Sequence, residues 1–339
     1  MPLQRREFLR GSLAGSLSLS LMRSAQAQKP VPGPPPTPFK INPFQVELPI
    51  PAVLAPLAAT RTPPFKPGDC YHGVAPEFAD LATYQVYPLK YYALDMVPAV
   101  HEFIPGVKTP VWTYGGTVPG PTFRTRTGEP VVVRMTNKLP VETSVHLHGG
   151  HLPAHADGFP TFYVLPGKAR DYFYPNTVPL LNGVRDMTES PSTCWYHDHA
   201  MDITGHNAYM GLQGFYLNFD DIESKLVSNN VLPGGLYDVP LGLSDKRLNA
   251  DGTLYYDFLN HDGELGDVFC VNGKVQPKFT VERRKYRFRI LGGSTARFYR
   301  LRLSNGQPFL QVGNDAWLLP NAIAKNEILI SPAKRADIV

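Results

Sequence analysis

The chain has 339 residues, of which 43% are hydrophobic and 18% are charged, as in folded proteins and unlike disordered ones. Within residues 1–27, four arginines and one glutamate give a charge of +3, so the formal net charge of +4 leaves only +1 for the remainder. A nearly neutral body gives no electrostatic reason to expect binding to nucleic acid or to an anionic membrane surface. The 35 prolines are unfavourable in helices and central strands, so we expect a loop-rich chain that is not mainly helical.

The N-terminus has the parts of an export signal. Arg5-Arg6 and Phe8-Leu9 precede an apolar run over residues 11–22, and Ala25-Gln26-Ala27 follows as a cleavage site. We predict a signal peptide over residues 1–27 that resembles the twin-arginine type, which implies the twin-arginine export machinery and a periplasmic or extracellular location. The alternative is a soluble amphipathic N-terminus. The apolar run is too short to span a bilayer as a helix, and we predict no transmembrane segment elsewhere.

Residues 28–67 are predicted to be a proline-rich tether or strap, because residues 30–67 contain 13 of the 35 prolines. A first β-rich domain is predicted over residues 68–222. Its clearest strand is 131–139, where apolar and polar residues alternate with a period of two. Residues 143–148 and 195–199 are also predicted as strands.

A second β-rich domain is predicted over residues 236–339, after a polar break at 220–235 that ends in Pro-Gly-Gly. Strands are expected at 286–290 and 299–303, each with an apolar inner face and an arginine outer face. Asp251-Gly252 indicates a hairpin.

A short internal repeat relates the two regions. Pro121-Thr122-Phe123 precedes the strand at Val131, and Pro277-Lys278-Phe279 precedes the strand at Tyr286. Because no long helical period is present, the sequence predicts an all-β protein of two antiparallel sandwiches.

Two His-x-His pairs are the chemical feature of the sequence, at His146 and His148 and at His197 and His199. Residues i and i+2 of a strand point to the same face, so each pair would present two imidazoles side by side. Neutral imidazoles suit copper, zinc or iron. The alternative is that these histidines lie on a solvated strand face.

The other histidines and the cysteines are weaker candidates. Single histidines at 72, 101 and 261 are expected to be structural, and those at 151, 155 and 206 lie close enough to the pairs to stay open. Three cysteines allow at most one disulfide, and Cys194 is expected to be a buried, inert thiol.

The segments around the two histidine pairs resemble the first two copper motifs of the multicopper oxidases, with the strongest resemblance to the bacterial spore-coat laccase and bilirubin oxidase branch. The similarity extends over nearly everything after residue 45. The similar segments are Val145–Gly150, Trp195–Met201, Leu48–Pro51, Tyr114–Thr122, Gly211–Gly214, Tyr237–Leu241, Val271–Val275, Arg284–Arg289 and Ser331–Asp337.

The resemblance implies a fold of tandem cupredoxin-like, plastocyanin-type Greek-key sandwiches, three in the family. It implies that His146 ligates a type 2 copper and that His148, His197 and His199 ligate a type 3 pair. That copper cluster would reduce O2 to water with electrons from a type 1 copper. Asp157 matches an acid that this branch places near the type 2 copper, as a candidate proton donor; a simple turn aspartate before Gly158 is the equal alternative.

The sequence departs from the family pattern in its third domain. The His-x-x-His-x-His and His-Cys-His motifs are absent, and no cysteine is flanked by histidines. We therefore expect half of the trinuclear ligands, no type 1 site and a chain that stops within its second domain. The polypeptide by itself is expected to be inactive.

Two functions follow. The first is a laccase-like multicopper oxidase that couples one-electron oxidation of phenolic, tetrapyrrole or metal-ion donors to reduction of O2. The second is a non-catalytic exported cupredoxin-fold protein that acts as a scaffold or binding module in the cell envelope. The four matched histidines favour the oxidase, since a scaffold does not need them. The sequence does not identify the reducing substrate.

Overall fold

The computed structural model describes residues 34–58, 87–259 and 263–339. The predicted signal peptide, both ends of the proline-rich segment, Cys70, His72 and His261 lie outside these residues. The described helices and strands all belong to one unit, residues 37–339.

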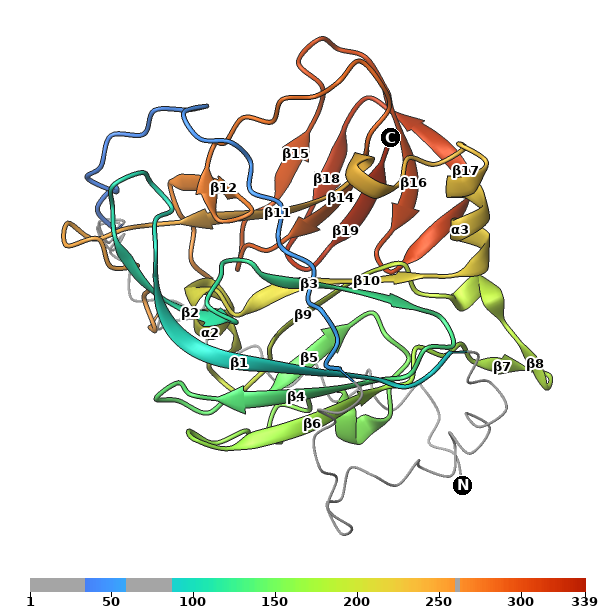
Figure 1. The fold of residues 1–339 in the computed structure, drawn as a ribbon. Helices are drawn as coiled ribbons and strands as arrows, with labels where there is room; N and C mark the ends of the chain where they lie inside the picture. The colour runs from blue at the N-terminus through green and yellow to red at the C-terminus, as the bar shows by residue number, and fades with distance from the viewer. Residues whose placement is uncertain (1–33, 59–86, 260–262) are drawn as a thin grey trace, which may run out of the picture. The chain divides into compact units, whose positions relative to one another are not determined.

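The first region holds strands β1 to β10, and eight of these form two four-stranded sheets (Figure 1). The strands are β1 (Lys90–His101), β2 (Thr109–Tyr114), β3 (Gly120–Arg126), β4 (Val131–Asn137), β5 (Val145–His148), β6 (Ala169–Tyr174), β7 (Leu180–Leu181), β8 (Val184–Arg185), β9 (Thr193–Asp198) and β10 (Gln213–Phe219). The sheet orders are β2-β1-β4-β6 and β3-β10-β9-β5, and β7 and β8 form a separate hairpin. Their apolar residues build one core that includes Met96, Val133, Leu147 and Tyr196.

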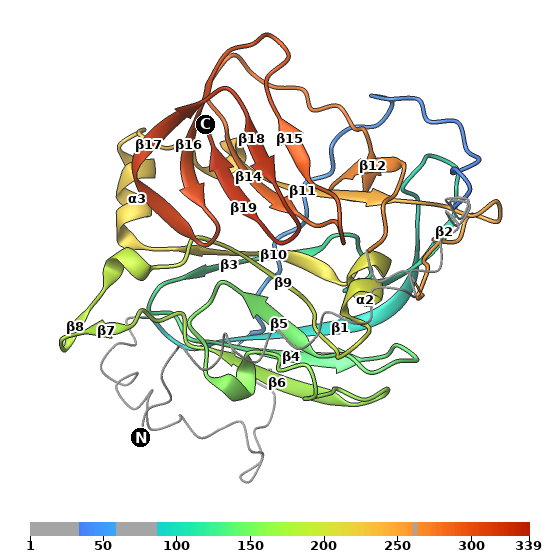
Figure 2. The same ribbon diagram turned by 180° about the vertical axis from the view of Figure 1, so that it is seen from behind.

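The second region has a seven-stranded sheet in the order β13-β12-β11-β14-β19-β16-β17, and β15 pairs with β18 (Figure 2). Its strands are β11 (Asp238–Lys246), β12 (Val268–Val271), β13 (Lys274–Val275), β14 (Arg287–Gly292), β15 (Tyr299–Leu301), β16 (Phe309–Asn314), β17 (Trp317–Lys325), β18 (Ile328–Ile330) and β19 (Arg335–Ile338). Parallel pairs of strands occur in both regions: β1 with β4 and β10 with β3 in the first, and β11 with β14 in the second. The fold is all-β and cupredoxin-like, as predicted.

The internal repeat has a structural counterpart in the described part of the proline-rich segment. Val53 forms a parallel bridge with Thr122, and Glu47 forms one with Lys278. These partners are the middle residues of the two Pro-x-Phe motifs. The extended segment therefore contacts both copies of the motif at the same position.

Two short α-helices interrupt the described strands: α2 (Thr204–Met210) and α3 (Asp221–Ser228). Helix α3 lies within the polar break predicted at 220–235, and Asp220 caps it by accepting a hydrogen bond from the Glu223 N–H. Neither of the described α-helices has the length and the continuous apolar sequence that a membrane-spanning helix needs.

The predicted strands at 131–139, 143–148 and 195–199 are confirmed as β4, β5 and β9, each within a few residues. One expectation about β14 is wrong. Arg287 and Arg289 do not form an outer face; both are completely buried. The alternation of residues is correct, but the arginine face of this strand is covered by the first sandwich.

The two buried arginines belong to an ion network that joins the sandwiches. Arg287 donates to Glu223 at 2.7 Å and to Asp337 at 2.5 Å. Arg289 donates to Asp238 at 2.7 Å and to Glu223 at 2.5 Å. With Arg124, which pairs with Asp238, three cations face three carboxylates, so the buried charges are compensated.

The network also holds the beginning of β9. The Ser192 hydroxyl donates to Glu223 at 2.7 Å, and the Thr193 hydroxyl donates to Asp337 at 2.9 Å. His197 lies four residues further along the same strand. The ionic network therefore anchors a strand that carries candidate ligands.

Candidate metal centre

The two histidine pairs come together because β5 and β9 are antiparallel neighbours. In their register His146 lies opposite His197, and His148 lies opposite Trp195. Residues directly opposite each other share a face of the sheet, so these four side chains lie on one side. Leu147 and Tyr196 point to the other side, into the core.

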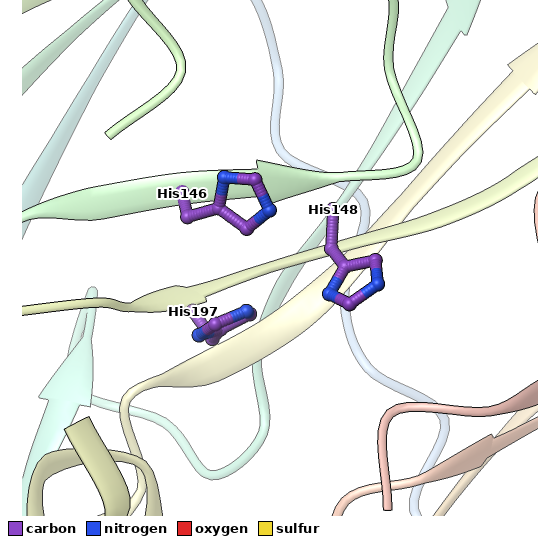
Figure 3. Close-up of side chains that lie close together, drawn as sticks. All are labelled: His146, His148 and His197. Carbon is purple, nitrogen blue, oxygen red and sulfur yellow. The ribbon is translucent and has the colours of Figure 1, made fainter. Parts of the chain in front are cut away.

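Three of the four predicted ligands form a group that could hold a metal ion. One ring nitrogen each from His146, His148 and His197 lies within 4.8 Å of the others (Figure 3). His199 follows the end of β9 and lies beside this group, with ring centroids 5.3 Å from His146 and 5.6 Å from His197. The structure thus gathers all four residues that the spacing singled out.

Backbone carbonyls orient two of the rings. Nδ1 of His146 lies 2.5 Å from the carbonyl oxygen of Asp157, and Nδ1 of His197 lies 2.7 Å from that of Asp198. A ring N–H at Nδ1 donates to these carbonyls, which leaves Nε2 as the lone-pair donor. His199 differs, because its buried Nδ1 has no hydrogen-bond partner among the described residues.

The surroundings keep two histidines neutral. Burial, followed by the positive charge of Arg335, lowers the pKa of His148 to about 4. Burial lowers the pKa of His197 well below its ordinary value, and the neighbouring His146 adds to the effect. Neutral imidazole is the form that binds metals.

Arg335 was not singled out from the sequence, because it lies 187 positions after His148. It projects from β19 and donates through Nε to the Thr193 carbonyl at 3.2 Å. A Cβ on Gly149 would lie 2.8 Å from its Nη2. The glycine that follows His148 therefore leaves the room that this guanidinium occupies.

Trp195 forms one wall of the histidine group. Its ring stacks on His197 with centroids 4.1 Å apart, and on His148 with centroids 5.4 Å apart. Only 6% of Trp195 is exposed. The indole therefore limits both water access to the two imidazoles and their rotation.

Asp157 lies against His146. One carboxylate oxygen is 3.3 Å from His146 Nδ1, and this contact lowers the pKa of the carboxyl group, with burial opposing it. The side chain is 47% exposed, so it connects the site with solvent. Gly158 follows with a φ of 79°, and a Cβ there would lie 2.1 Å from the Val145 carbonyl oxygen.

The other described histidines have local partners. His101 bonds the Gly273 carbonyl, His151 bonds the Glu189 carbonyl, and His206 packs among Trp112, Tyr256 and Phe258. His155 lies in a short 3-10 helix, Ala154–Ala156. Cys194 and Cys270 are buried and form no disulfide with each other within the described part of the chain. Burial raises the pKa of each thiol to about 12, as expected for an inert Cys194.

The donor set fits copper. Three of the imidazoles lie on β5 and β9 and the fourth directly follows β9. Burial keeps two of them neutral, and two have Nδ1 bonded to backbone carbonyls, a set that suits copper among the metals that imidazole binds. The Nδ1 of His199, buried and without a hydrogen-bond partner among the residues that the structure describes, is a further nitrogen available to a metal. His146, His148, His197 and His199 are therefore the residues that could hold copper, one of the metals that imidazole suits.

Comparisons with known proteins show which sequences and folds this chain is similar to. The family model described as "Multicopper oxidase" matches residues 98–221. The laccase of Bacillus stratosphericus is 36% identical over 88% of this chain and 59% of its own length. The bilirubin oxidase of Albifimbria verrucaria is 36% identical over 74% of this chain and 42% of its own length.

A solved structure shows the same similarity at the level of the fold. The laccase from Pediococcus acidilactici superposes with a TM-score of 0.69 at 28% identity, covering 90% of this chain and 57% of that one. The chain thus spans about two to three fifths of the length of these relatives. The shared domain, the sequence similarity and the common fold show that this chain belongs to the multicopper oxidase family.

Proposed function

We propose that this chain contributes half of the copper cluster of a laccase-like oxidase. The reaction would couple one-electron oxidation of a phenolic, tetrapyrrole or metal-ion donor to four-electron reduction of O2 to water. The observation that carries the proposal is the convergence of the His146, His148 and His197 ring nitrogens within 4.8 Å, with His199 alongside. By similarity to the family, His146 is assigned to the type 2 copper and the other three to the type 3 pair.

Copper, when bound, supplies the one-electron redox steps that reduction of O2 requires. The protein's own residues supply orientation and protection. The carbonyls of Asp157 and Asp198 fix which ring nitrogen of His146 and His197 faces the metal. Trp195 covers His148 and His197 and restricts water beside them.

Asp157 is proposed to relay protons to the site. Its lowered pKa makes the carboxylate its resting form, so it accepts a proton from solvent before it passes one inward. Its side chain is half-exposed and lies 3.3 Å from His146, so it is in contact with both the solvent and the site. The competing interpretation is a turn residue before Gly158, and Asp157→Asn separates the two because a turn tolerates asparagine.

We further propose that the 339 residues by themselves bind copper without turning over substrate. A blue type 1 site uses a thiolate with two imidazoles, and no cysteine here is flanked by histidines. The remaining ligands of the trinuclear cluster and those of the type 1 copper would be residues other than these four histidines. The twin-arginine signal of residues 1–27 would deliver the protein to the periplasm or the exterior.

The second candidate is a non-catalytic envelope protein with the same fold. The exposed leucines and valine of the β7–β8 hairpin, Leu180, Leu181 and Val184, are the observation that favours an interaction role. The histidine group favours the oxidase, because a binding module would not need neutral, oriented imidazoles.

Copper titration of the full chain tests the proposal. We expect Cu(II) binding with nitrogen hyperfine structure in the electron paramagnetic resonance spectrum, lost in His148→Ala and His197→Ala and retained in the control His101→Ala. Retained binding in both site variants would contradict the ligand assignment. An intense blue copper–thiolate band, or phenol oxidation by this chain alone, would contradict the proposed lack of turnover.

A further inference from the structure

We propose that Asp198 is a positioning residue that fixes the ligand segment around His199. The proposal rests on the proposed copper site and adds a function for a residue that has no contact with the metal. Asp198 lies between the two histidines of the second pair, and its side chain is completely buried.

The sheet alone does not fix His199. Strand β9 ends at Asp198, so His197 lies within the ladder and His199 lies one residue beyond it. One backbone bond continues the pairing, from the His199 N–H to the Ser144 carbonyl at 2.6 Å. The turn that follows requires another constraint, because a strand end is free to diverge from its neighbour.

The carboxylate of Asp198 supplies that constraint with three hydrogen bonds. Oδ1 accepts from the Ser144 N–H at 3.0 Å, two residues before His146. Oδ2 accepts from the Ala200 N–H at 3.1 Å, directly after His199. Oδ2 also accepts from the Asn207 amide at 2.9 Å, on α2. One side chain thus ties the approach to the first pair to the exit from the second pair.

The three partners select a carboxylate rather than an amide. Each of them is an N–H donor, and all of them are completely buried. An asparagine at position 198 would direct its own N–H groups at the Ala200 and Asn207 donors or, in the opposite orientation of the amide, at the Ser144 donor. A buried donor without an acceptor loses its hydrogen bond with no water to replace it.

Asp198 does not act as a ligand. Asp198 pairs with Val145, the neighbour of His146 in β5. It therefore lies on the face of the sheet opposite to His146 and His197. Both of its oxygens are committed to the donors named above, and it is outside the histidine group. Its effect on the metal therefore passes through the backbone on either side of His199.

Three variants test the proposal in the full chain: Asp198→Asn, the exchange Asp198→Asn with Asn207→Asp, and the control Asp202→Asn. Asp202 is exposed and lies three residues after His199, so it undergoes the same chemical change without contacting the three bonds of Asp198. Cu(II) affinity is measured by calorimetric titration. The copper hyperfine pattern and the urea unfolding midpoint are measured on the same samples.

We expect Asp198→Asn to weaken Cu(II) binding about 10- to 100-fold and to alter the hyperfine pattern, while Asp202→Asn leaves both unchanged. The exchange should restore part of the affinity, because the amide now at position 198 can donate to the carboxylate now at position 207 while its oxygen still accepts from Ser144. The Ala200 bond stays lost, so the rescue is incomplete. If Asp198 had a structural role alone, Asp198→Asn would lower the unfolding midpoint but leave the copper hyperfine pattern unchanged. The exchange variant would then restore no Cu(II) affinity.

The outcomes are separable. If the unaltered chain does not bind Cu(II), the proposed function fails. If it binds and Asp198→Asn binds equally well with the same spectrum, the proposed role of Asp198 is wrong while the copper site stands. Should Asp198→Asn not fold, Asn207→Ala removes one of the three bonds; an unchanged affinity and spectrum in that variant would contradict the positioning role.

Discussion

The indole of Trp195 lies nearly parallel to the imidazole of His197, with 26° between the ring planes and 4.1 Å between centroids. This contact leads to the first prediction. Trp195→Ala should weaken Cu(II) binding about 10-fold, because the ring of His197 loses its support. Trp195→Phe should retain most of the affinity, since a flat ring remains and the indole N–H has no partner among the described residues. Calorimetric titration measures both; equal binding by the alanine variant would contradict a supporting role.

Gly158 gives a second prediction, with a matched control at Gly167. Both have positive φ, 79° and 74°, so alanine adds about 1 kcal/mol of backbone strain at either position. Only at Gly158 would the new Cβ collide with β5, 2.1 Å from the Val145 carbonyl oxygen. Gly158→Ala should therefore lower both stability and copper affinity. Gly167→Ala should lower stability alone, and the prediction fails if the two variants bind copper alike.

A third prediction concerns the ion network between the sandwiches. Glu223→Gln should destabilise the protein by ~3 kcal/mol, because it leaves Arg287 and Arg289 short of a buried counter-charge. Asp221→Asn, two residues earlier and 75% exposed, should change stability by less than about 1 kcal/mol. Urea unfolding at neutral pH measures the difference, and equal midpoints would show that the network is not a source of stability.

The same carboxylate predicts a pH dependence. Burial alone would raise the pKa of Glu223, but Arg289 and Arg287 outweigh it and lower the pKa to about 2, below the ordinary 4.5. As pH falls below 4.5, the unfolded chain takes up this proton before the folded one does. The contribution of Glu223 is thus complete above pH 4.5 and lost as pH approaches about 2. Unfolding midpoints across this interval should fall less steeply in Glu223→Gln than in the unaltered chain.

The histidine site could be predicted from sequence because its information is local. A spacing of two on a strand places His146 with His148 and brings His197 into line with them once β5 and β9 pair. The alternation of apolar and polar residues likewise predicted strand β4. For Arg287 and Arg289 the alternation identified which residues share a face, but the period of two does not say which face another sheet covers.

Contacts across long separations could not be predicted. Arg335 donates to Thr193 and lowers the pKa of His148 because the second sandwich packs against the first. From the sequence, Asp198 is simply the residue between two ligands, on the opposite face. Its role depends on Ser144 and Asn207, which no spacing rule brings to it.

The compensated charges at the junction have a consequence for protein engineering. A fragment ending before α3 would leave the Ser192 and Thr193 hydroxyls without Glu223 and Asp337, their acceptors. A fragment starting after α3 would leave Arg287 and Arg289 without Glu223 and without the Ser192 hydroxyl. We therefore expect neither sandwich to fold as a separate module. In a chimera, the two sandwiches and helix α3 should therefore be transferred together.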